Sequence, residues 1–247
     1  MFEALKRLCS FSVKGFDVSP VFPQVVKAIL TQSLDVKRLI YQFIVINSKK
    51  CPDLCLLCVD KLHKDSTENE NPLIRGLALR TLSSLNAPEI VQVLQHDITK
   101  GASDSSPYVR KAAAYAIPKL VHLDPDQKES MIELIGKMIG DQAPSVLGPA
   151  LFAFNTVCPN EFRLLHAHFR RIVQLLVDFD EWSQIVTLDI LLRYARNQFV
   201  SPFIPVKETA QKAHGKDDKS EKSDDSSDSS SDNESDAFEN FLNKKGV

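Results

Sequence analysis

The feature that most constrains this chain is an apolar pattern that recurs about every 36 residues. In each copy, mostly apolar or small residues occupy positions one, four, five, eight and nine, which is the spacing of one helix face. The copies start at Val36, Ile74, Val109 and Val146, with a weaker fifth at Trp182, so that successive starts lie 38, 35, 37 and 36 residues apart. A fixed period of this length is typical of stacked helical repeats. We therefore expect function on extended surfaces that bind partners, rather than in a catalytic cleft.

A second set of apolar helical stretches lies between these copies. The stretches cover residues 20–31, 52–64, 88–100, 126–139 and 161–177. Each repeat is then a helix, a turn and a second helix, and a single pair of this kind buries its apolar face only by stacking on its neighbours. The chain has only 8 glycines and almost no strand-like alternation. The sequence predicts an all-α protein with five helix pairs.

Prolines mark the expected helix starts, where a missing N–H costs nothing. These prolines are Pro52, Pro72, Pro88, Pro107, Pro125, Pro144 and Pro159. Pro118 differs, because it lies late in the helix predicted over residues 107–122. An internal proline removes a backbone hydrogen bond and crowds the preceding turn, at a cost of about 3 kcal/mol. We expect a bend or an early helix end at Pro118.

Composition narrows the class of protein. The net charge of −2 argues against nucleic-acid binding carried by overall charge. No run of about 18 apolar residues would cross a membrane, and the amphipathic stretch 2–8 lacks the apolar core of a secretory signal. Familiar catalytic motifs and Gly-rich phosphate loops are missing, and no histidine precedes a glutamate, as the iron-binding helical-repeat enzymes would require. We expect a cytoplasmic protein that is not an enzyme.

Two groups of residues invite a metal interpretation. Cys51, Cys55 and Cys58 lie close together, with His63 nearby, but a zinc site needs four ligands and no second cysteine pair follows. Buried, reduced thiols are the favoured interpretation. His166 and His168 are two residues apart, so on a helix they point in nearly opposite directions. We expect no metal and no cofactor.

Basic residues recur just after the first apolar residue of the second helices. They are Lys37, Arg38, Arg75, Arg110 and Lys111. One hypothesis is a basic ladder that meets an acidic protein or a phosphoinositide headgroup. The favoured one is structural, with each cation paired to an acidic residue in the turn before it, such as Asp104 for Arg110. Leu147 and Ser183 end the series in the later repeats.

The composition changes from residue 207 onward. Residues 217–236 contain nine Asp or Glu, two Lys and eight Ser. Such a segment cannot bury enough apolar surface to offset the entropy of ordering, so we predict a disordered acidic tail. Serines followed by acidic residues are candidate sites for an acid-directed kinase, with a solubilising linker as the alternative. The candidates are Ser220, Ser223, Ser227 and Ser231.

The repeat resembles the HEAT/armadillo type. Residues 104–117 match the HEAT second-helix pattern Pro-x-Val-Arg-x-x-Ala through Pro107, Val109, Arg110 and Ala113. The resemblance implies an α-solenoid, and by itself it implies only a scaffold, because many unrelated proteins use this fold.

A narrower resemblance is to the trunk of the β-adaptins, large chains of the adaptor complexes that sort membrane cargo into vesicles. Residues 34–41, 71–80 and 106–111 look like this trunk. Four further stretches resemble the third adaptor class, whose traffic runs to lysosomes, vacuoles and related organelles. These stretches are residues 123–129, 157–160, 180–184 and 193–202. The resemblance covers about residues 20–202.

The resemblance implies three segments and a set of partners. Residues 1–19 would be a partial N-terminal helix and linker, residues 20–202 the trunk, and residues 203–247 the acidic tail. The trunk would pack against a second large chain, a medium chain and a small chain, and would contact an Arf-type small GTPase. The protein would then sit peripherally on Golgi and endosomal membranes and on coated vesicles. The alternative is a general HEAT scaffold, such as a transport receptor or a phosphatase platform.

A full β-adaptin is several times longer, with further trunk repeats, a hinge and an appendage domain. We expect either a short natural protein or a piece of a longer adaptin.

The register of the repeats can be tested at Val109. Replacing Val109 with Asp should bury an unpaired charge and unfold the neighbouring repeats. The thermal melt of the variant should fall well below that of the unmodified chain. A melt unchanged by the substitution would contradict the register.

Overall fold

The computed structural model describes residues 1–199, which contain helices and no strand. The predicted acidic tail and its four candidate serines lie outside the described residues. The α-helices are α1 (Phe2–Val13), α2 (Phe22–Lys27), α3 (Leu34–Asn47), α4 (Pro52–Leu56), α5 (Val59–Thr67), α6 (Pro72–Leu82), α7 (Val91–Ala102), α8 (Pro107–Leu123), α9 (Lys128–Ile139), α10 (Pro144–Val157), α11 (Arg163–His166), α12 (Phe169–Leu175) and α13 (Glu181–Gln198). Short 3₁₀ helices cover Ser19–Val21, Ala28–Leu30, Pro88–Ile90, Pro125–Gln127 and Leu176–Asp178.

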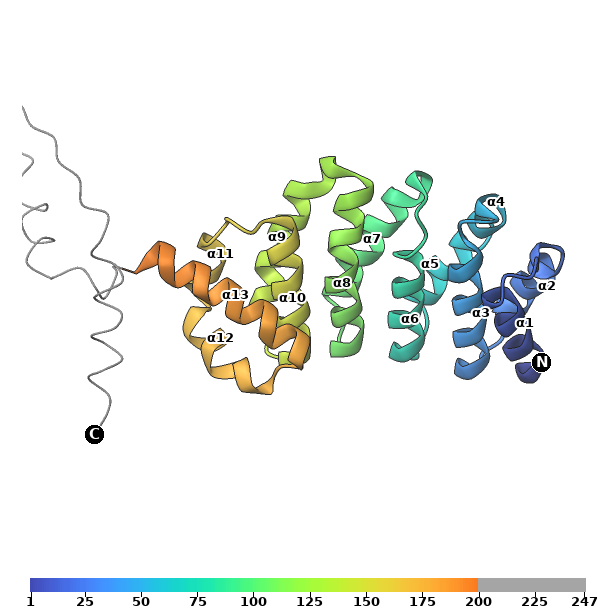
Figure 1. The fold of residues 1–247 in the computed structure, drawn as a ribbon, viewed down its shortest axis with the longest axis horizontal. Helices are drawn as coiled ribbons and strands as arrows, with labels where there is room; N and C mark the ends of the chain where they lie inside the picture. The colour runs from blue at the N-terminus through green and yellow to red at the C-terminus, as the bar shows by residue number, and fades with distance from the viewer. Residues whose placement is uncertain (200–247) are drawn as a thin grey trace, which may run out of the picture. The chain divides into compact units, whose positions relative to one another are not determined.

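Within residues 1–199 the helices form two rows (Figure 1). The first row contains the second helix of each repeat, in the order α3, α6, α8, α10 and α13, and each packs on the next. The second row contains α5, α7 and α9, which pack on one another and on α6, α8 and α10 of the first row. The prediction of an all-α solenoid is confirmed. Helix α1 packs on α3, so residues of the predicted lead-in also join the stack.

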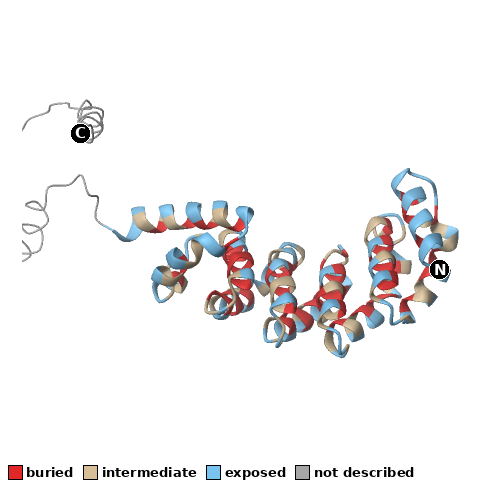
Figure 2. Ribbon diagram, turned by 90° about the horizontal axis from the view of Figure 1, so that it is seen from below, coloured by how far each residue is buried: buried red, intermediate tan, exposed pale blue. Residues whose placement is uncertain are grey.

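The apolar core lies between the two rows, where Figure 2 shows the buried surfaces of the helices facing one another. Val36, Ile74, Val109 and Val146, the first apolar residues of the first four copies, are all buried. The spacing of these residues therefore predicts the core correctly, because a period of 3.6 residues keeps one helix face toward the neighbouring row.

The fifth copy follows the predicted register only in part, since Ile190 is buried and Val186 packs against the core. Trp182 is 78% exposed and Ile185 is 62% exposed. Besides Ile190, the buried residues of α13 are Ser183, Thr187 and Tyr194, and α13 is inclined to α10 in Figure 1. Trp182 and Ile185 were thus wrongly predicted as core residues, since apolar character marked the face of α13 that α10 does not cover.

Six of the seven prolines predicted to mark helix starts do begin a helix or a 3₁₀ turn. Pro52, Pro72, Pro107 and Pro144 begin helices, and Pro88 and Pro125 begin 3₁₀ turns that lead into α7 and α9. Pro159 lies in a turn before α11. The early helix end predicted at Pro118 is wrong, because α8 continues to Leu123 with Ile117 and Leu120 buried on either side of the proline. The bend at Pro118 stays a prediction.

The helix predicted over residues 161–177 is broken into α11, α12 and a 3₁₀ turn. The break lets two aromatic rings reach Tyr194 of α13. Phe169 stacks on the Tyr194 ring at 4.6 Å between centroids, and Phe162 meets it edge-on at 5.9 Å. In one continuous helix, Phe162 and Phe169 would lie about two turns apart along the axis. In the structure, both contact the same ring.

At Gly148, α10 lies very close to α13. A Cβ atom built on Gly148 would lie 2.5 Å from Ser183 Oγ and 2.7 Å from Ser183 Cβ. Gly136 of α9 is a useful comparison, because its nearest neighbour would be the flexible end of the Leu164 side chain, at 3.2 Å.

Alanine at these two glycines should have opposite effects on stability. Both substitutions gain helix propensity, worth about 1 kcal/mol. Gly136→Ala should be neutral or stabilising, whereas Gly148→Ala should lower the free energy of unfolding by about 1–3 kcal/mol because Ser183 and α13 must move. Urea unfolding followed by circular dichroism measures both. Equal effects would show that α13 does not approach α10 this closely.

Candidate functional site

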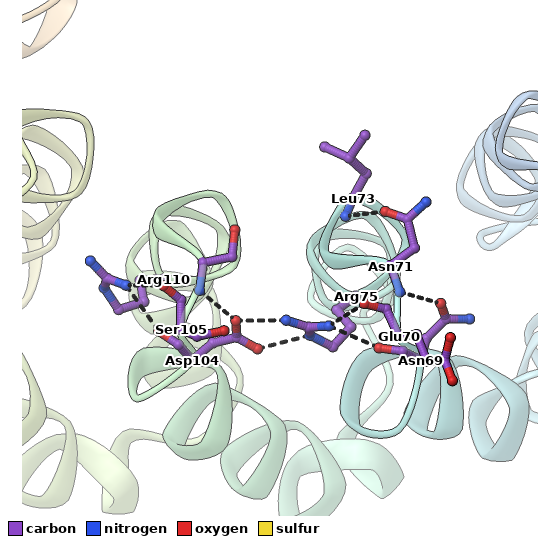
Figure 3. A network of polar contacts seen from close by, with 9 residues as sticks. Asn69, Glu70, Asn71, Leu73, Arg75, Asp104, Ser105 and Arg110 are labelled. Carbon is purple, nitrogen blue, oxygen red and sulfur yellow. Dashed lines mark hydrogen bonds and ion pairs between the residues drawn. The ribbon is translucent and has the colours of Figure 1, made fainter.

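A polar bridge that occurs twice joins consecutive repeats at the turn edge of the first row, and Figure 3 shows the bridge between Arg75 and Asp104. Arg75 of α6 makes a bidentate ion pair with Asp104. Its Nε donates to Oδ2 and its Nη2 donates to Oδ1, each at 2.8 Å. Arg110 of α8 binds Asp141 in the same way, at 2.6 and 3.1 Å. Asp104 and Asp141 each belong to the turn of the following repeat. The bridges therefore fix one repeat to the next.

The same arginines also hold the turns of their own repeats. Arg75 Nη1 donates to the carbonyl oxygens of Asn69 and Glu70, at 2.9 and 3.0 Å. Arg110 Nη1 donates to those of Asp104 and Ser105, at 2.9 and 3.1 Å. Five guanidinium N–H groups in a fixed plane suit this arrangement, in which one side chain meets a carboxylate and two carbonyls.

Each bridging aspartate also organises the turn that it occupies. Asp104 Oδ1 accepts the Ser106 N–H at 2.8 Å, and Asp141 Oδ1 accepts the Ala143 N–H at 2.9 Å. In both cases the acceptor lies two residues before the donor, just ahead of the proline that begins the second helix. One carboxylate thus shapes a helix start and receives a cation from the previous repeat.

A variant of the bridge joins the first two repeats. Lys37 of α3 is 2% exposed and pairs with Asp65 Oδ2 of α5. Tyr41 donates its hydroxyl to the same carboxylate oxygen, and Asn69 Nδ2 donates to Asp65 Oδ1 at 3.3 Å. Burial, followed by the hydrogen bond to Asp65, raises the Tyr41 pKa, so the phenol stays protonated.

Electrostatics favour the charged form at both arginine bridges. Burial raises the pKa of the Asp104 carboxyl, but hydrogen bonds from Arg75 and the Ser106 N–H outweigh it and leave the pKa below its ordinary value. The Asp141 pKa is lowered in the same way by Arg110 and the Ala143 N–H. The hydrogen bonds to the two aspartates raise the pKa of Arg75 and of Arg110.

The predicted partner of Arg110 was wrong. The Asp104 carboxylate binds Arg75, and Arg110 takes only the main-chain carbonyl of Asp104. A spacing in the sequence could have shown this, because Asp104 and Asp141 each stand three residues before a helix-starting proline, and Arg75 and Arg110 each stand three residues after one. In a stack, the arginine of one repeat then lies beside the aspartate of the next.

The remaining two residues of the predicted basic ladder do not take part in the bridges at the turn edge. Arg38 and Lys111 line hollows on the exposed face of the first row. Neither forms an ion pair with a carboxylate of residues 1–199. The series ends where predicted, with Leu147 fully buried and Ser183 bonded to Asp180 at 2.7 Å.

The cysteine and histidine candidates occupy separate places. Cys55 and Cys58 are buried, and burial raises the pKa of these thiols to about 11 and about 12. The partly buried Cys51 donates to Ser19 Oγ at 3.2 Å. His166 shares a 2.7 Å hydrogen bond with Tyr194, whereas His168 lies beside Gly140.

His63 belongs to a small polar cluster that joins α5 to α7. Its Nδ1 lies 2.7 Å from Asp97 Oδ1, the Ser66 hydroxyl donates to Asp97 Oδ2 at 2.5 Å, and the His96 ring approaches the same carboxylate. The buried Asp97 thus has its hydrogen-bonding needs met by neighbouring side chains. Sequence reasoning missed this cluster, because its members come from two repeats.

These features define a class of protein: a helical-repeat protein whose consecutive repeats are joined by charged bridges. The sequence model of the family described as Adaptin N terminal region matches residues 2–241. The chain belongs to this adaptin family.

Curated relatives agree with the family. The chain is 43% identical over 218 residues to the AP-3 complex subunit beta of Dictyostelium discoideum, covering 88% of this chain and 20% of that protein. It is 43% identical over 200 residues to the AP-3 complex subunit beta-2 of Mus musculus, covering 81% of this chain and 18% of that protein. The chain thus spans about a fifth of the length of these relatives.

Solved structures show the same fold. A homology model of the full-length AP-3 complex in an intermediate open conformation gives a TM-score of 0.61 at 29% identity, covering 83% of this chain and 33% of that chain. Computationally designed armadillo repeat proteins for modular peptide recognition give a TM-score of 0.52 at 16% identity, covering 78% of this chain and 92% of theirs, which shows the fold alone. Among residues 1–199, no helix combines the length and apolar character needed to span a membrane.

The charged bridges make stability depend on pH. Asp104→Asn should lower the free energy of unfolding at pH 7 by about 1–3 kcal/mol, because an amide cannot form the charge-assisted pair with Arg75. The folded-state pKa of Asp104 is depressed, so the stabilisation is present above the unfolded pKa of about 4 and is lost as pH falls through the folded value.

Urea unfolding at pH 7 and pH 3 measures this effect. The difference between the variant and the unmodified chain should narrow at the lower pH. Asp126→Asn is the matched control, since Asp126 is exposed and forms no ion pair within residues 1–199. A difference that stays constant with pH, or an equal loss in the control, would contradict the bridge.

Proposed function

We propose that this chain is a non-catalytic scaffold of a vesicle-coat adaptor complex that sorts membrane cargo from Golgi and endosomes to lysosome-type organelles. The observation that carries the proposal is the 42–43% identity to AP-3 beta subunits across most of the chain, together with family membership. The stacked repeats support it physically, because they present long surfaces rather than an enclosed site.

The partners follow from the same relationship. The chain would pack against a second large chain, a medium chain and a small chain of such a complex. An Arf-type small GTPase would recruit it to the cytoplasmic face of Golgi and endosomal membranes, with peripheral contact only. A general HEAT platform, such as a transport receptor or a phosphatase scaffold, is less well supported, since the adaptin family model and the AP-3 relatives cover the same residues.

Affinity purification tests the proposal. The full chain, tagged and expressed in Dictyostelium cells, should recover the second large, medium and small AP-3 chains in a mass-spectrometric comparison. Val109→Asp is the control, because loss of the stack should abolish this recovery. Added Arf-type GTPase should be retained with a non-hydrolysable GTP analogue and released with GDP. Recovery of nuclear-transport or phosphatase proteins in place of adaptor chains would contradict the proposal.

A further inference from the structure

Two adjoining hollows on the exposed face of the first row make up a groove. Its larger part has a volume of about 710 Å³ and lies between α6, α8 and α10. Its smaller part, of about 470 Å³, lies between α3, α6 and α8. Arg80 and Tyr108 line both parts, so the two parts adjoin each other and together reach from α3 to α10. A groove of this extent suits an extended chain rather than a compact small molecule.

The groove is lined by cations without carboxylate partners. Arg38, Arg80, Lys111 and Lys119 line it, and no Asp or Glu of residues 1–199 does. None of these four cations forms an ion pair with a carboxylate of the described chain. By contrast, Arg75 and Arg110 each pair with an aspartate in a turn, and Lys37 pairs with Asp65 of α5.

Lys119 shows how the groove could hold an anion. Its ammonium group donates to the hydroxyls of Ser83 and Ser84, at 3.3 and 3.1 Å. Partial burial, and then the charge of Arg80, lower the pKa of Lys119. Two cations facing one hollow repel each other, and an anion between them would turn this repulsion into attraction.

Apolar rings lie beside these cations. Tyr115 of α8 and Phe152 of α10 are 37% and 41% exposed, with ring centroids 5.9 Å apart. Tyr108 is 43% exposed at the junction of the two parts of the groove. Exposed aromatic side chains in a hollow are typical of sites where a partner buries an apolar side chain.

We propose that this groove binds an extended acidic segment of a partner protein. Carboxylates of the segment would meet Arg80 and Lys119, and an aromatic side chain would rest against Tyr115 and Phe152. A phosphoinositide headgroup would satisfy the cations but would leave the rings uncovered, so a peptide accounts for more of the groove.

A labelled peptide tests the proposal with the full chain. The probe is a fluorescein-labelled dodecapeptide with six glutamates and a central phenylalanine. Fluorescence anisotropy should give micromolar binding that weakens as NaCl rises from 50 to 500 mM. A second peptide with glutamine in place of every glutamate should bind at least about tenfold more weakly.

Alanine variants test which side chains contact the peptide. Arg80→Ala and Lys119→Ala should each weaken binding about three- to tenfold, whereas Lys100→Ala, on α7 in the second row, should leave it unchanged. Tyr115→Ala should weaken binding of the phenylalanine peptide but not of a version with alanine in its place. All four residues are at least a third exposed, so circular-dichroism melts should show intact folding.

Three results would overturn the proposal. The first is the absence of peptide binding, and the second is binding that is insensitive to Arg80→Ala and Lys119→Ala. The third is binding of vesicles that contain phosphatidylinositol phosphates, lost in these variants, without binding of the peptide. That third result would identify the groove as a membrane contact instead.

Discussion

No helix pair in residues 1–199 can bury its own apolar face, and this constraint shapes the rest of the structure. Val109 of α8 and Val146 of α10 are buried, and both helices pack on the second helices of the repeats before and after them. The contact between successive repeats therefore supplies the core, through the hydrophobic effect. It also sets the register in which the turn of one repeat meets the arginine of the previous one. The bridges from Arg75 and Arg110 lie at this contact, so they report directly on the stacking.

The period of 36 residues was enough to predict the architecture, because helix period and repeat period are local properties. Val36, Ile74, Val109 and Val146 fall in the core as predicted, and prolines begin the predicted helices. The prediction that Trp182 belongs to the core was wrong for a physical reason. An apolar residue identifies the core face of a helix only where a neighbouring helix covers that face. The single helix predicted over 161–177 is broken in the structure, and Phe162 and Phe169 from this stretch contact the ring of Tyr194, which periodicity along one helix does not reveal.

The basic ladder shows where sequence reasoning reaches its limit. Adjacent residues on a helix point about 100° apart, so Arg110 and Lys111 cannot serve the same surface. Arg110 reaches the turn edge and binds Asp141, whereas Lys111 lines the groove. Two neighbouring basic residues in the sequence thus have different surroundings: Arg110 is paired with an aspartate, and Lys111 has no ion-pair partner within residues 1–199. The cross-repeat partner could have been predicted from the spacing of aspartate, proline and arginine, but the groove depends on three helices at once.

The stacking register is tested most directly by a double-mutant cycle on Arg75 and Asp104, compared with a cycle on Arg75 and Asp141. Urea unfolding of the single and double alanine variants gives the coupling energy of each pair. The structure predicts a coupling of about 1 kcal/mol or more for Arg75 with Asp104, which lies in the next repeat, and almost none for Arg75 with Asp141, one repeat further along. Equal couplings, or a coupling confined to Asp141, would contradict the stack described above.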